Sequence, residues 1–318
     1  MPTRTTLIAP LNWGLGHATR CVPIIKRCVE SGERVVIAAN GAALVFLRQE
    51  FPNIETVKLS GYNMRYACGK MLPLTITLQM PLFGISILIE HIITIRLSRK
   101  YKVDRIISDN RYGVWNNNIE SIIITHQPYI QLPKHLSIFC KPLHTITARL
   151  LSKFNHIWVP DYADVSQSLS GALSHGGAID RQLEYIGPLS RFTAAQIINF
   201  DIQIPDLLVV LSGPGRQKFK LARQIVKHFQ TDKKIVILGA SPGKNVNKAE
   251  GNINYINHLP TKEFQYLLQH TPHIISFAGY TTIMDLHVLD QQAKLVPTAG
   301  QWEQEYLIKW RCCQSANL

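Results

Sequence analysis

Short apolar runs rich in β-branched residues alternate with amphipathic stretches along almost the whole chain. In the first half, the apolar runs predict strands at Thr6–Leu11, Arg34–Ala39, Arg105–Ser108, Ser121–Thr125 and His156–Val159. The amphipathic stretches predict helices at Ala18–Ser31, Ala42–Glu50, Ile85–Tyr101 and Leu143–Phe154. Apolar strands that alternate with helices indicate a parallel sheet that is covered on both faces.

The same alternation restarts after Pro205. It predicts strands at Leu207–Leu211, Lys234–Leu238, Ile253–Ile256, His273–Ser276 and Lys294–Pro297. It predicts helices at Lys218–Phe229, Thr261–His270, Thr281–Asp290 and Gln301–Trp310. The chain of 318 residues is long enough for two cores, and the irregular stretch 187–205 predicts a hinge between them. We therefore expect an α/β fold with two Rossmann-like, doubly wound domains facing a cleft: an N-terminal domain 1–188 and a C-terminal domain 189–318.

The segment Met71–Leu97 is nearly all apolar and resembles a membrane span in composition. Pro73, Pro81 and Gly84 interrupt it, so a helix inside the fold with a preceding apolar loop is the favoured interpretation. A membrane-surface patch is the second interpretation, and a true span is the third.

The net charge of +13 favours anionic partners. The basic residues are scattered, without the stripe and reading element of a nucleic-acid-binding protein, so nucleic acid is excluded as the expected partner. A phosphate ligand together with an anionic membrane surface explains the charge. The six cysteines have no CxxC spacing and the N-terminus has no signal-peptide core, so we expect reduced thiols and a cytoplasmic location, with peripheral binding to the inner membrane face.

A glycine-rich turn follows the first predicted strand, at Asn12-Trp13-Gly14-Leu15-Gly16-His17. Such a turn directs backbone N–H groups and the positive end of a helix toward a ligand at the carboxyl edge of the sheet. Thr19 occupies the place of the third glycine, so the dinucleotide fingerprint is not met. His17 stands where a general base is useful, although a packing turn with a capping histidine is the simpler explanation.

Two more loops follow predicted strands in the second half. Ser212-Gly213-Pro214-Gly215 lets the backbone approach a diphosphate, although a plain turn is equally consistent with it. In the block Ser276–Asp285, Gly279 precedes Thr281 and Thr282, which are suited to capping a helix, and Asp285 can accept hydrogen bonds from a ribose diol. The last predicted helix begins with four polar residues, Gln301, Glu303, Gln304 and Glu305. The same pattern is typical of an ordinary acidic first turn.

Together these loops resemble family 28 glycosyltransferases. Gly14–His17 resembles the N-terminal glycine–histidine loop of that family, and Ser276–Asp285, continuing to Gln304 and Glu305, resembles its donor-binding signature. The lipid II N-acetylglucosaminyltransferase is a similar member. The resemblance implies a GT-B fold, an inverting mechanism, a UDP-sugar donor and no required metal or cofactor. The absence of a DxD acid pair agrees with that expectation.

The resemblance also implies site residues. Asp285 would hold the donor ribose, and Gln304 and Glu305 would bind the donor sugar. Glu305 stands where the lipid II enzyme usually has a second glutamine, so a different sugar is compatible with the motif. The remaining donor-side candidates would contact the diphosphate, the uracil or the loop backbone: Gly14, Gly16, Ser212, Gly213, Asn257, His258, Leu259, Gly279, Thr281 and Thr282.

Two loops at strand ends of the first half predict the acceptor side, with Asp109 and Arg111 in one and His126 in the other. Asp109 is the rival of His17 as the general base, although Asp109-Asn110 is also a common turn sequence. The expected reaction is transfer of a hexose such as N-acetylglucosamine to a hydroxyl of a lipid-linked or other cell-envelope acceptor.

Two other functions stay open at this stage. One is a UDP-sugar 2-epimerase, although the sequence offers no convincing set of acids for it. The other is a catalytically weak or degenerate nucleotide-sugar-binding protein. The short tail after Gln301–Trp310, with Cys312-Cys313, favours the latter because it leaves no evident helix to return to the first domain. The donor sugar, the acceptor and the oligomeric state are not determined by these patterns.

Overall fold

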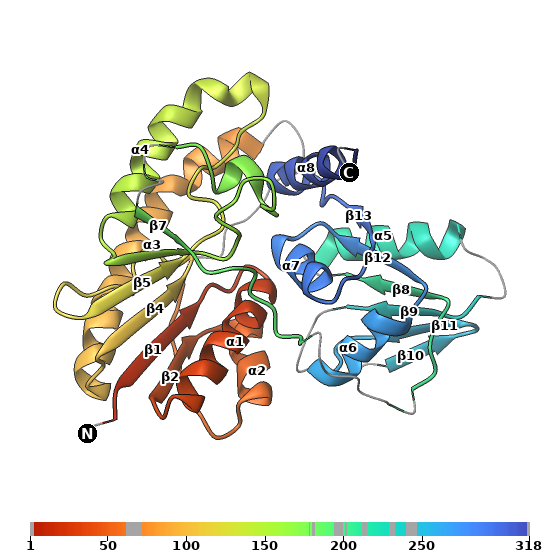
Figure 1. Ribbon diagram of the computed structural model, residues 1–318, viewed down its shortest axis with the longest axis horizontal. Helices are drawn as coiled ribbons and strands as arrows, with labels where there is room; N and C mark the ends of the chain where they lie inside the picture. Colours follow the sequence, from red (N-terminus) through yellow and green to blue (C-terminus); the bar gives the residue numbers. More distant parts are fainter. Residues whose placement is uncertain are drawn as a thin grey trace.

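A computed structural model describes residues 3–61, 72–177, 179, 182–193, 200, 202–211, 215–228, 233–239 and 247–316. It contains two α/β domains side by side, each built on a largely parallel sheet (Figure 1). Each predicted strand and helix is present. The last strand of the first sheet ends at Tyr185 and the first strand of the second begins at Leu207, so the predicted boundary at 188 falls in the connection between the sheets.

The first sheet is parallel throughout, in the order β3-β2-β1-β4-β5-β6-β7. Its central strand β1 is buried at every position, as a strand covered on both faces must be. The strands are β1 Thr5–Pro10, β2 Arg34–Ala39, β3 Glu55–Lys58, β4 Arg105–Asp109, β5 Glu120–Ile124, β6 His156–Val159 and β7 Leu183–Tyr185.

The strand order reverses direction at β1, so the connecting helices divide between the two faces of the first sheet. Helices α1 and α2 lie on the face toward the second domain, and α3 lies on the other face (Figure 1). The helical segments are α1 Gly16–Glu30, α2 Gly41–Glu50, α3 Leu72–Tyr101, η2 Lys134–Phe139, α4 Cys140–Leu151 and η3 Gly171–Leu173.

The second sheet has the order β10-β11-β9-β8-β12-β13, and only its edge strand β10 is antiparallel. Its strands are β8 Leu207–Val210, β9 Ile235–Leu238, β10 Asn247–Glu250, β11 Ile253–Ile256, β12 His273–Phe277 and β13 Lys294–Val296. Its helices are α5 Gly215–His228, α6 Thr261–His270, α7 Tyr280–Val288 and α8 Trp302–Ala316.

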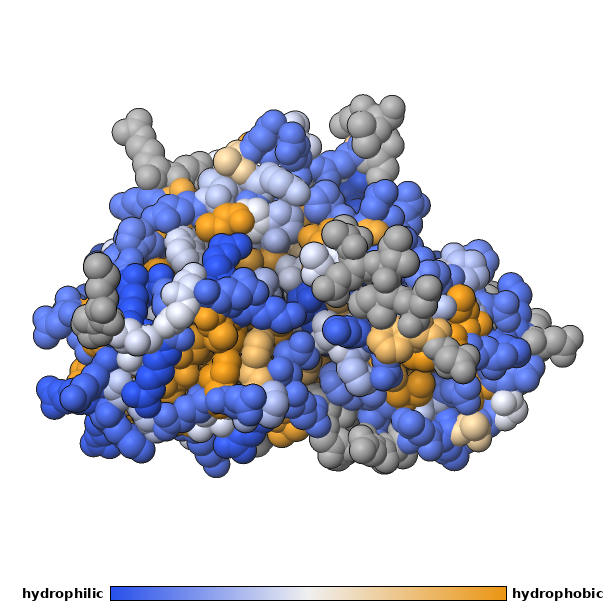
Figure 2. All heavy atoms as spheres, turned by 60° about the horizontal axis from the view of Figure 1, so that its bottom comes forward, coloured by the Kyte–Doolittle hydropathy of each residue, from blue (hydrophilic) through white to orange (hydrophobic). Residues whose placement is uncertain are grey.

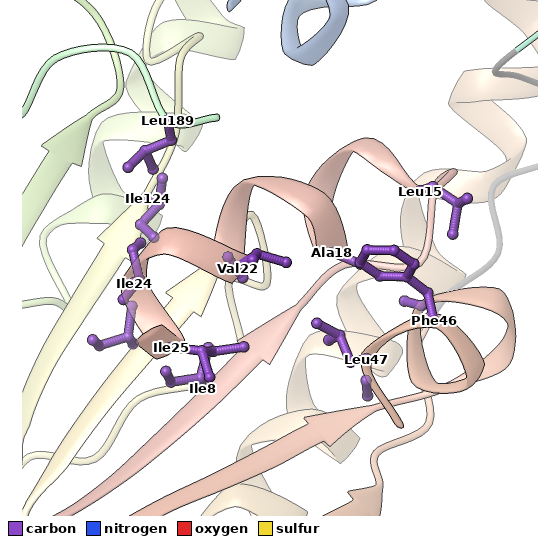
Figure 3. Close-up of a cluster of buried hydrophobic side chains, with 14 of the residues drawn as sticks. Ile8, Leu15, Ala18, Val22, Ile24, Ile25, Phe46, Leu47, Ile124 and Leu189 are labelled. Atoms are coloured by element: carbon purple, nitrogen blue, oxygen red, sulfur yellow. The ribbon is translucent and has the colours of Figure 1, made fainter. Parts of the chain in front are cut away.

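A hydrophobic core joins the two domains. Figure 3 shows its first-domain part, where side chains of α1 and α2 pack with β1 and β5. The same cluster includes Tyr280, Ile283 and Met284 of α7 and Leu307 of α8. Burial of these second-domain side chains against the first domain stabilises one relative placement of the two sheets.

The last helix returns to the first domain, which corrects the expectation of a missing crossing helix. On α8, Trp310 Nε1 donates to the carbonyl oxygen of Ser168 at 2.8 Å. The Tyr306 hydroxyl accepts from the amide of Ala172 at 2.7 Å. Gly171 lies so close to the Trp310 ring that an added Cβ would be 2.6 Å from it. The tail that suggested degeneracy is therefore a structural part of the domain junction.

Helix α3 is not the buried helix that the sequence favoured. It begins at Leu72, so the apolar stretch expected to be a loop is helical, and it continues through Pro81. From Pro81 to Tyr101 it has the length and hydropathy of a membrane span, but Glu90, Thr94 and Ser98 on one face are buried in the protein. The opposite face exposes apolar side chains, so α3 covers the sheet with one face only.

The face of the molecule in Figure 2 is mostly hydrophilic, with apolar side chains visible only in patches between polar ones. On α3 the exposed apolar residues are Leu82, Ile85, Leu88, Ile89 and Ile92.

Candidate active site

The glycine loop between β1 and α1 lies against the second domain. Gly14 has a φ of +101°, a backbone conformation that favours glycine. A Cβ at Gly16 would come within 2.8 Å of Thr281 Oγ1 at the start of α7. The two loops that the sequence placed on opposite domains therefore meet, and glycine is required for this approach.

A buried ion pair stands behind the loop. Arg20 on α1 and Asp109 at the end of β4 are 1% and 0% exposed. Arg20 Nε donates to Asp109 Oδ2 at 2.6 Å, and its terminal nitrogen donates to Oδ1. Burial alone would raise the pKa of Asp109, but Arg20 and His17 beside it hold that pKa well below its usual value. Asp109 is therefore an anion at every physiological pH.

His17 contacts this anion. Its Nδ1 lies 2.9 Å from Asp109 Oδ1 and 3.0 Å from a terminal nitrogen of Arg20, so this nitrogen either donates to the carboxylate or accepts from the guanidinium. In the tautomer that donates to Asp109, the other ring nitrogen, Nε2, is unprotonated. Burial, followed by the nearby positive charge of Arg20, lowers the pKa of His17 below its ordinary value. His17 is thus a neutral imidazole at pH 7, oriented by Asp109 and able to take a proton.

Asp109 is unsuited to the role of direct base that the sequence left open for it. Its side chain is inaccessible, both of its oxygens accept from Arg20, and its lowered pKa makes it a poor proton acceptor. The geometry assigns it to orienting His17.

A second histidine connects the domains. His126, just after β5, has its Nδ1 3.2 Å from Arg20, and since a guanidinium only donates, this nitrogen accepts. His126 Nε2 then carries the proton and donates to Glu303 Oε1 of α8 at 2.8 Å. The His126 ring stacks on Tyr280 at 4.3 Å. Burial alone would raise the pKa of Glu303, but His126 lowers it below its ordinary value.

The start of α8 differs from the predicted donor contacts. Gln304 is buried, and its side chain accepts from the amide of Thr298 and donates to Gln301. Glu305 is exposed. Of the neighbouring polar residues, Glu303 is the one that faces the first domain, through His126. The sequence had treated it as part of an ordinary acidic turn.

Asp285 lies beside the connection between the domains. It is 9% exposed and accepts from the Ser190 hydroxyl at 2.6 Å. Burial raises its pKa to about 6, while Arg191 and Ser190 act in the opposite direction. With this pKa the carboxyl is mostly ionised at pH 7, but a hydrogen-bonding ligand can shift its protonation more easily than that of an ordinary aspartate.

We expect the titration of Asp285 to appear in protein stability. Its folded pKa of about 6 lies above the ordinary value, so the folded state binds more protons than the unfolded state between about pH 4 and 6. The free energy of unfolding should therefore fall by about 2–3 kcal/mol from this group as pH rises through that interval. Urea unfolding at pH 4 and pH 7 measures it. Asp285→Asn should remove this component of the difference, and an unchanged difference would contradict the assignment.

Arg191 in the same connection was not singled out by the sequence. It is 8% exposed, and its guanidinium carbon lies 5.4, 4.9 and 5.2 Å from the ring centres of Phe46, Phe192 and Phe264. Its Nε and one terminal nitrogen have no hydrogen-bond partner. An anionic ligand group would satisfy these donors.

The other donor-side candidates vary in accessibility. Asn257, His258 and Leu259 follow β11 and are half-buried, with His258 edge-on to Phe46 at 5.8 Å. Gly279, Thr281 and Thr282 at the start of α7 are also half-buried. Ser212 and Gly213 lie outside the described residues.

Arg111 does not face the acceptor side as predicted. It is 1% exposed, pairs with Glu90 Oε1 at 2.9 Å, and donates to the carbonyl oxygens of Leu59 and Ser60. These contacts join α3, through Glu90, to the loops that follow β3 and β4 of the first sheet. Because its donors are directed into the protein, Arg111 has a structural role.

Comparison with known proteins agrees with this architecture. No family model matches the chain. An uncharacterized glycosyltransferase of Methanosarcina acetivorans is 23% identical over 309 residues, covering 92% of this chain and 79% of that protein. The structure of Arabidopsis thaliana UGT89C1 complexed with UDP-L-rhamnose is similar with a TM-score of 0.57, at 12% identity over 97% of this chain and 83% of that chain. The chain has the GT-B fold.

Two further structures of this fold relate to the resemblances drawn from the sequence. MurG of Acinetobacter baumannii has a TM-score of 0.52 at 12% identity, covering 97% of this chain and 82% of that one. A protein of Listeria monocytogenes described as a UDP-N-acetylglucosamine 2-epimerase has a TM-score of 0.54 at 11% identity, covering 100% and 89%. At these identities the likeness establishes the fold alone.

Proposed function

We propose that this chain is a glycosyltransferase that moves a sugar from a UDP-sugar to a hydroxyl acceptor, with His17 as the general base. The observation that carries the proposal is the neutral His17 imidazole, oriented by the buried Asp109 anion at the loop that meets the second domain. The sequence relative from Methanosarcina and the UDP-L-rhamnose complex of the Arabidopsis protein support the reaction class and the donor.

The proposed reaction is a direct displacement at the anomeric carbon. His17 Nε2 takes the proton of the acceptor hydroxyl as its oxygen forms the bond to that carbon, and the bond to the UDP oxygen breaks. Asp109 stabilises the imidazolium that forms. Backbone N–H groups at the start of α7 stabilise the leaving diphosphate. Inversion of configuration follows from this single displacement, and metal independence is a separate prediction that the family 28 resemblance implies.

For the donor, we propose that the second domain holds the nucleotide. We assign the ribose to Asp285 and the base to the loop 257–259, as the family 28 resemblance implies. Glu303 faces the first domain through His126, and we propose that it binds a hydroxyl of the sugar. The unpartnered nitrogens of Arg191 supply positive charge near Asp285. The family 28 resemblance supports N-acetylglucosamine or a related hexose as the sugar.

For the acceptor, we propose a lipid-linked molecule at an anionic membrane surface. Helices α3 and α4 and the segment η2 form what we name the apolar–basic face, on the side of the first sheet away from α1 and α2. Its only acidic residue is Glu90, which is buried against Arg111. Besides the five apolar residues of α3, it exposes Ile138, Phe139, Ile146, Arg96, Arg99, Lys100, Lys141 and Arg149.

This proposal predicts salt-sensitive membrane binding. The protein should co-sediment with phosphatidylglycerol vesicles at low salt and be released at high salt, because screening weakens attraction between basic side chains and anionic lipid. Leu88→Asp should weaken binding at least about tenfold, since it removes an inserted apolar side chain and adds a repelled charge. Val165→Asp, at a residue that is exposed elsewhere on the first domain, is the matched control. Absence of sedimentation at low salt would contradict the membrane proposal.

The reaction itself is tested by incubating the protein with a panel of UDP-sugars and a membrane lipid extract. Mass spectrometry of a lipid gaining one hexose unit would identify both substrates. Formation of a 2-epimer of the donor without transfer would instead support the epimerase. Donor binding without any product would support a degenerate nucleotide-sugar-binding protein.

A further inference from the structure

A pocket of about 400 Å³ lies between the C-terminal part of α3 and the connection from β4 to β5. Its lining residues on that connection, 116–119, come just before the first residue of β5, at the amino-terminal edge of the sheet. Asp109 and His126 lie at or beyond the opposite, carboxyl ends of β4 and β5. The pocket is therefore separate from the candidate active site.

Two buried polar atoms at this pocket have no partner. Ser98 is 3% exposed, and its hydroxyl makes no hydrogen bond. His91 Nδ1 is likewise buried and unpaired, while its ring is held by stacking on Trp115 at 4.0 Å. Buried polar groups are nearly always hydrogen-bonded, because leaving one unpaired destabilises the fold. Both atoms belong to residues that line the pocket, so a polar ligand bound there is the nearest possible source of a partner for them.

The lining residues favour a negatively charged ligand. Arg99 supplies a guanidinium, which only donates, and Asn116, Asn117 and Asn118 supply carboxamides. None of the lining residues that the structure describes carries a carboxylate, so a cation would gain no counter-charge there. An apolar ligand would leave Ser98 and His91 unpaired. An oxyanion accepts from the guanidinium, the Ser98 hydroxyl and the carboxamides, and from His91 Nδ1 when that nitrogen carries the proton.

We propose that this pocket binds a phosphate ester. The phosphate would contact Arg99 and Ser98, and an attached polyol would contact the three asparagines of the connection from β4 to β5. A volume of about 400 Å³ exceeds that of a phosphate alone, and the carboxamides match hydroxyl groups. The inference goes beyond the proposed transfer reaction and requires no step of it. Because Ile92 of the apolar–basic face is on the same helix, the phosphate ester can belong to a lipid headgroup or to a free metabolite.

The probe for the test is glycerol 3-phosphate, compared with glycerol and inorganic phosphate by titration calorimetry of the full chain. The phosphate ester should bind at millimolar concentration or below, and glycerol should not. Arg99→Gln should weaken binding at least about tenfold, because hydrogen bonds to charged groups are among the strongest. Arg96→Gln, at an exposed cation one turn earlier that does not line the pocket, should bind as the wild type does.

Ser98→Ala separates binding from folding. It removes a hydroxyl that has no partner, so the melting temperature should not fall, whereas affinity for glycerol 3-phosphate should fall several-fold. Equal weakening by Arg99→Gln and Arg96→Gln would overturn the proposal, since it would show attraction to general surface charge. Absence of binding by glycerol 3-phosphate at millimolar concentration would also overturn it.

A second experiment, with phosphatidylglycerol vesicles, identifies whether the phosphate comes from a lipid headgroup or from a soluble ester. If glycerol 3-phosphate releases the protein from phosphatidylglycerol vesicles, and Arg99→Gln binds them more weakly than Arg96→Gln does, the pocket holds a lipid headgroup. If the soluble ester binds without affecting vesicle binding, the pocket holds a free phosphate ester. Neither readout uses sugar transfer, so failure of the pocket proposal and failure of the proposed function are distinguishable.

Discussion

Replacing His17 by alanine should lower kcat for sugar transfer by about 10²–10⁴-fold, the usual contribution of a general base. His17 is the group that combines a neutral imidazole, partial exposure of 14% and an orienting anion at the junction of the domains. The KM for the UDP-sugar should change little, because we propose that the second domain holds the donor. Steady-state kinetics with the acceptor identified by mass spectrometry measures both constants.

The pH profile gives a second readout of the same residue. Because burial and Arg20 lower the pKa of His17, the acid limb of kcat/KM should lie below pH 6.5, its ordinary value. Activity should fall as His17 becomes protonated and unable to accept a proton. His287→Ala is the matched control, since His287 also lies at the domain junction, where it contacts Tyr162 at 2.9 Å. Wild-type turnover by His17→Ala would show that the base is misassigned.

Replacing Asp109 by asparagine should destabilise the protein by about 3–5 kcal/mol, because it leaves the buried Arg20 charge uncompensated. It should also reduce turnover, since His17 loses the acceptor that fixes its protonated nitrogen. Urea unfolding gives the free energy of unfolding, and kinetics on the folded fraction gives turnover. A loss this large is a substantial part of the stability of an ordinary domain.

The double variant Arg20→Met/Asp109→Leu separates the two effects. Apolar residues of similar volume often replace a buried ion pair without loss of stability, so this variant should recover much of the free energy of unfolding. It should not recover turnover, because His17 still lacks its orienting anion. Glu55→Gln, which breaks the exposed Arg34–Glu55 pair, should cost less than about 1 kcal/mol. Full activity in the double variant would show that Asp109 has a structural role only.

Burial and ion pairing also explain why two residues that the sequence predicted to line the site have other roles in the structure. Asp109 and Arg111 both follow β4, and residue type alone suggested that both line a ligand site. In the structure, Asp109 is neutralised by Arg20 and Arg111 is neutralised by Glu90. A charge that is buried and paired within the protein is not available to a substrate except through the group that it orients.

The sequence by itself determined the architecture and the edge of the sheets at which chemistry is expected. Strands such as β1 and β8 are continuous apolar runs because both of their faces are covered, so their identity is a local property of the chain. The strands β3, β7 and β10 were missed. They have three or four residues each, and β10 is fully exposed, so they carry no apolar run to detect.

The tertiary structure alone decided which side chains pair. Arg20 and Asp109 are 89 positions apart, and His126 and Glu303 are 177 positions apart, so neither pair has a local signature. The same holds for α3, whose apolar residues predict burial without stating what covers them. Periodicity fixes which residues share a face of a helix or strand, whereas the neighbour of that face is set by packing between distant segments. The His17 loop is thus recognisable from the local sequence. The environment that makes His17 a base arises only when distant segments pack together in the fold.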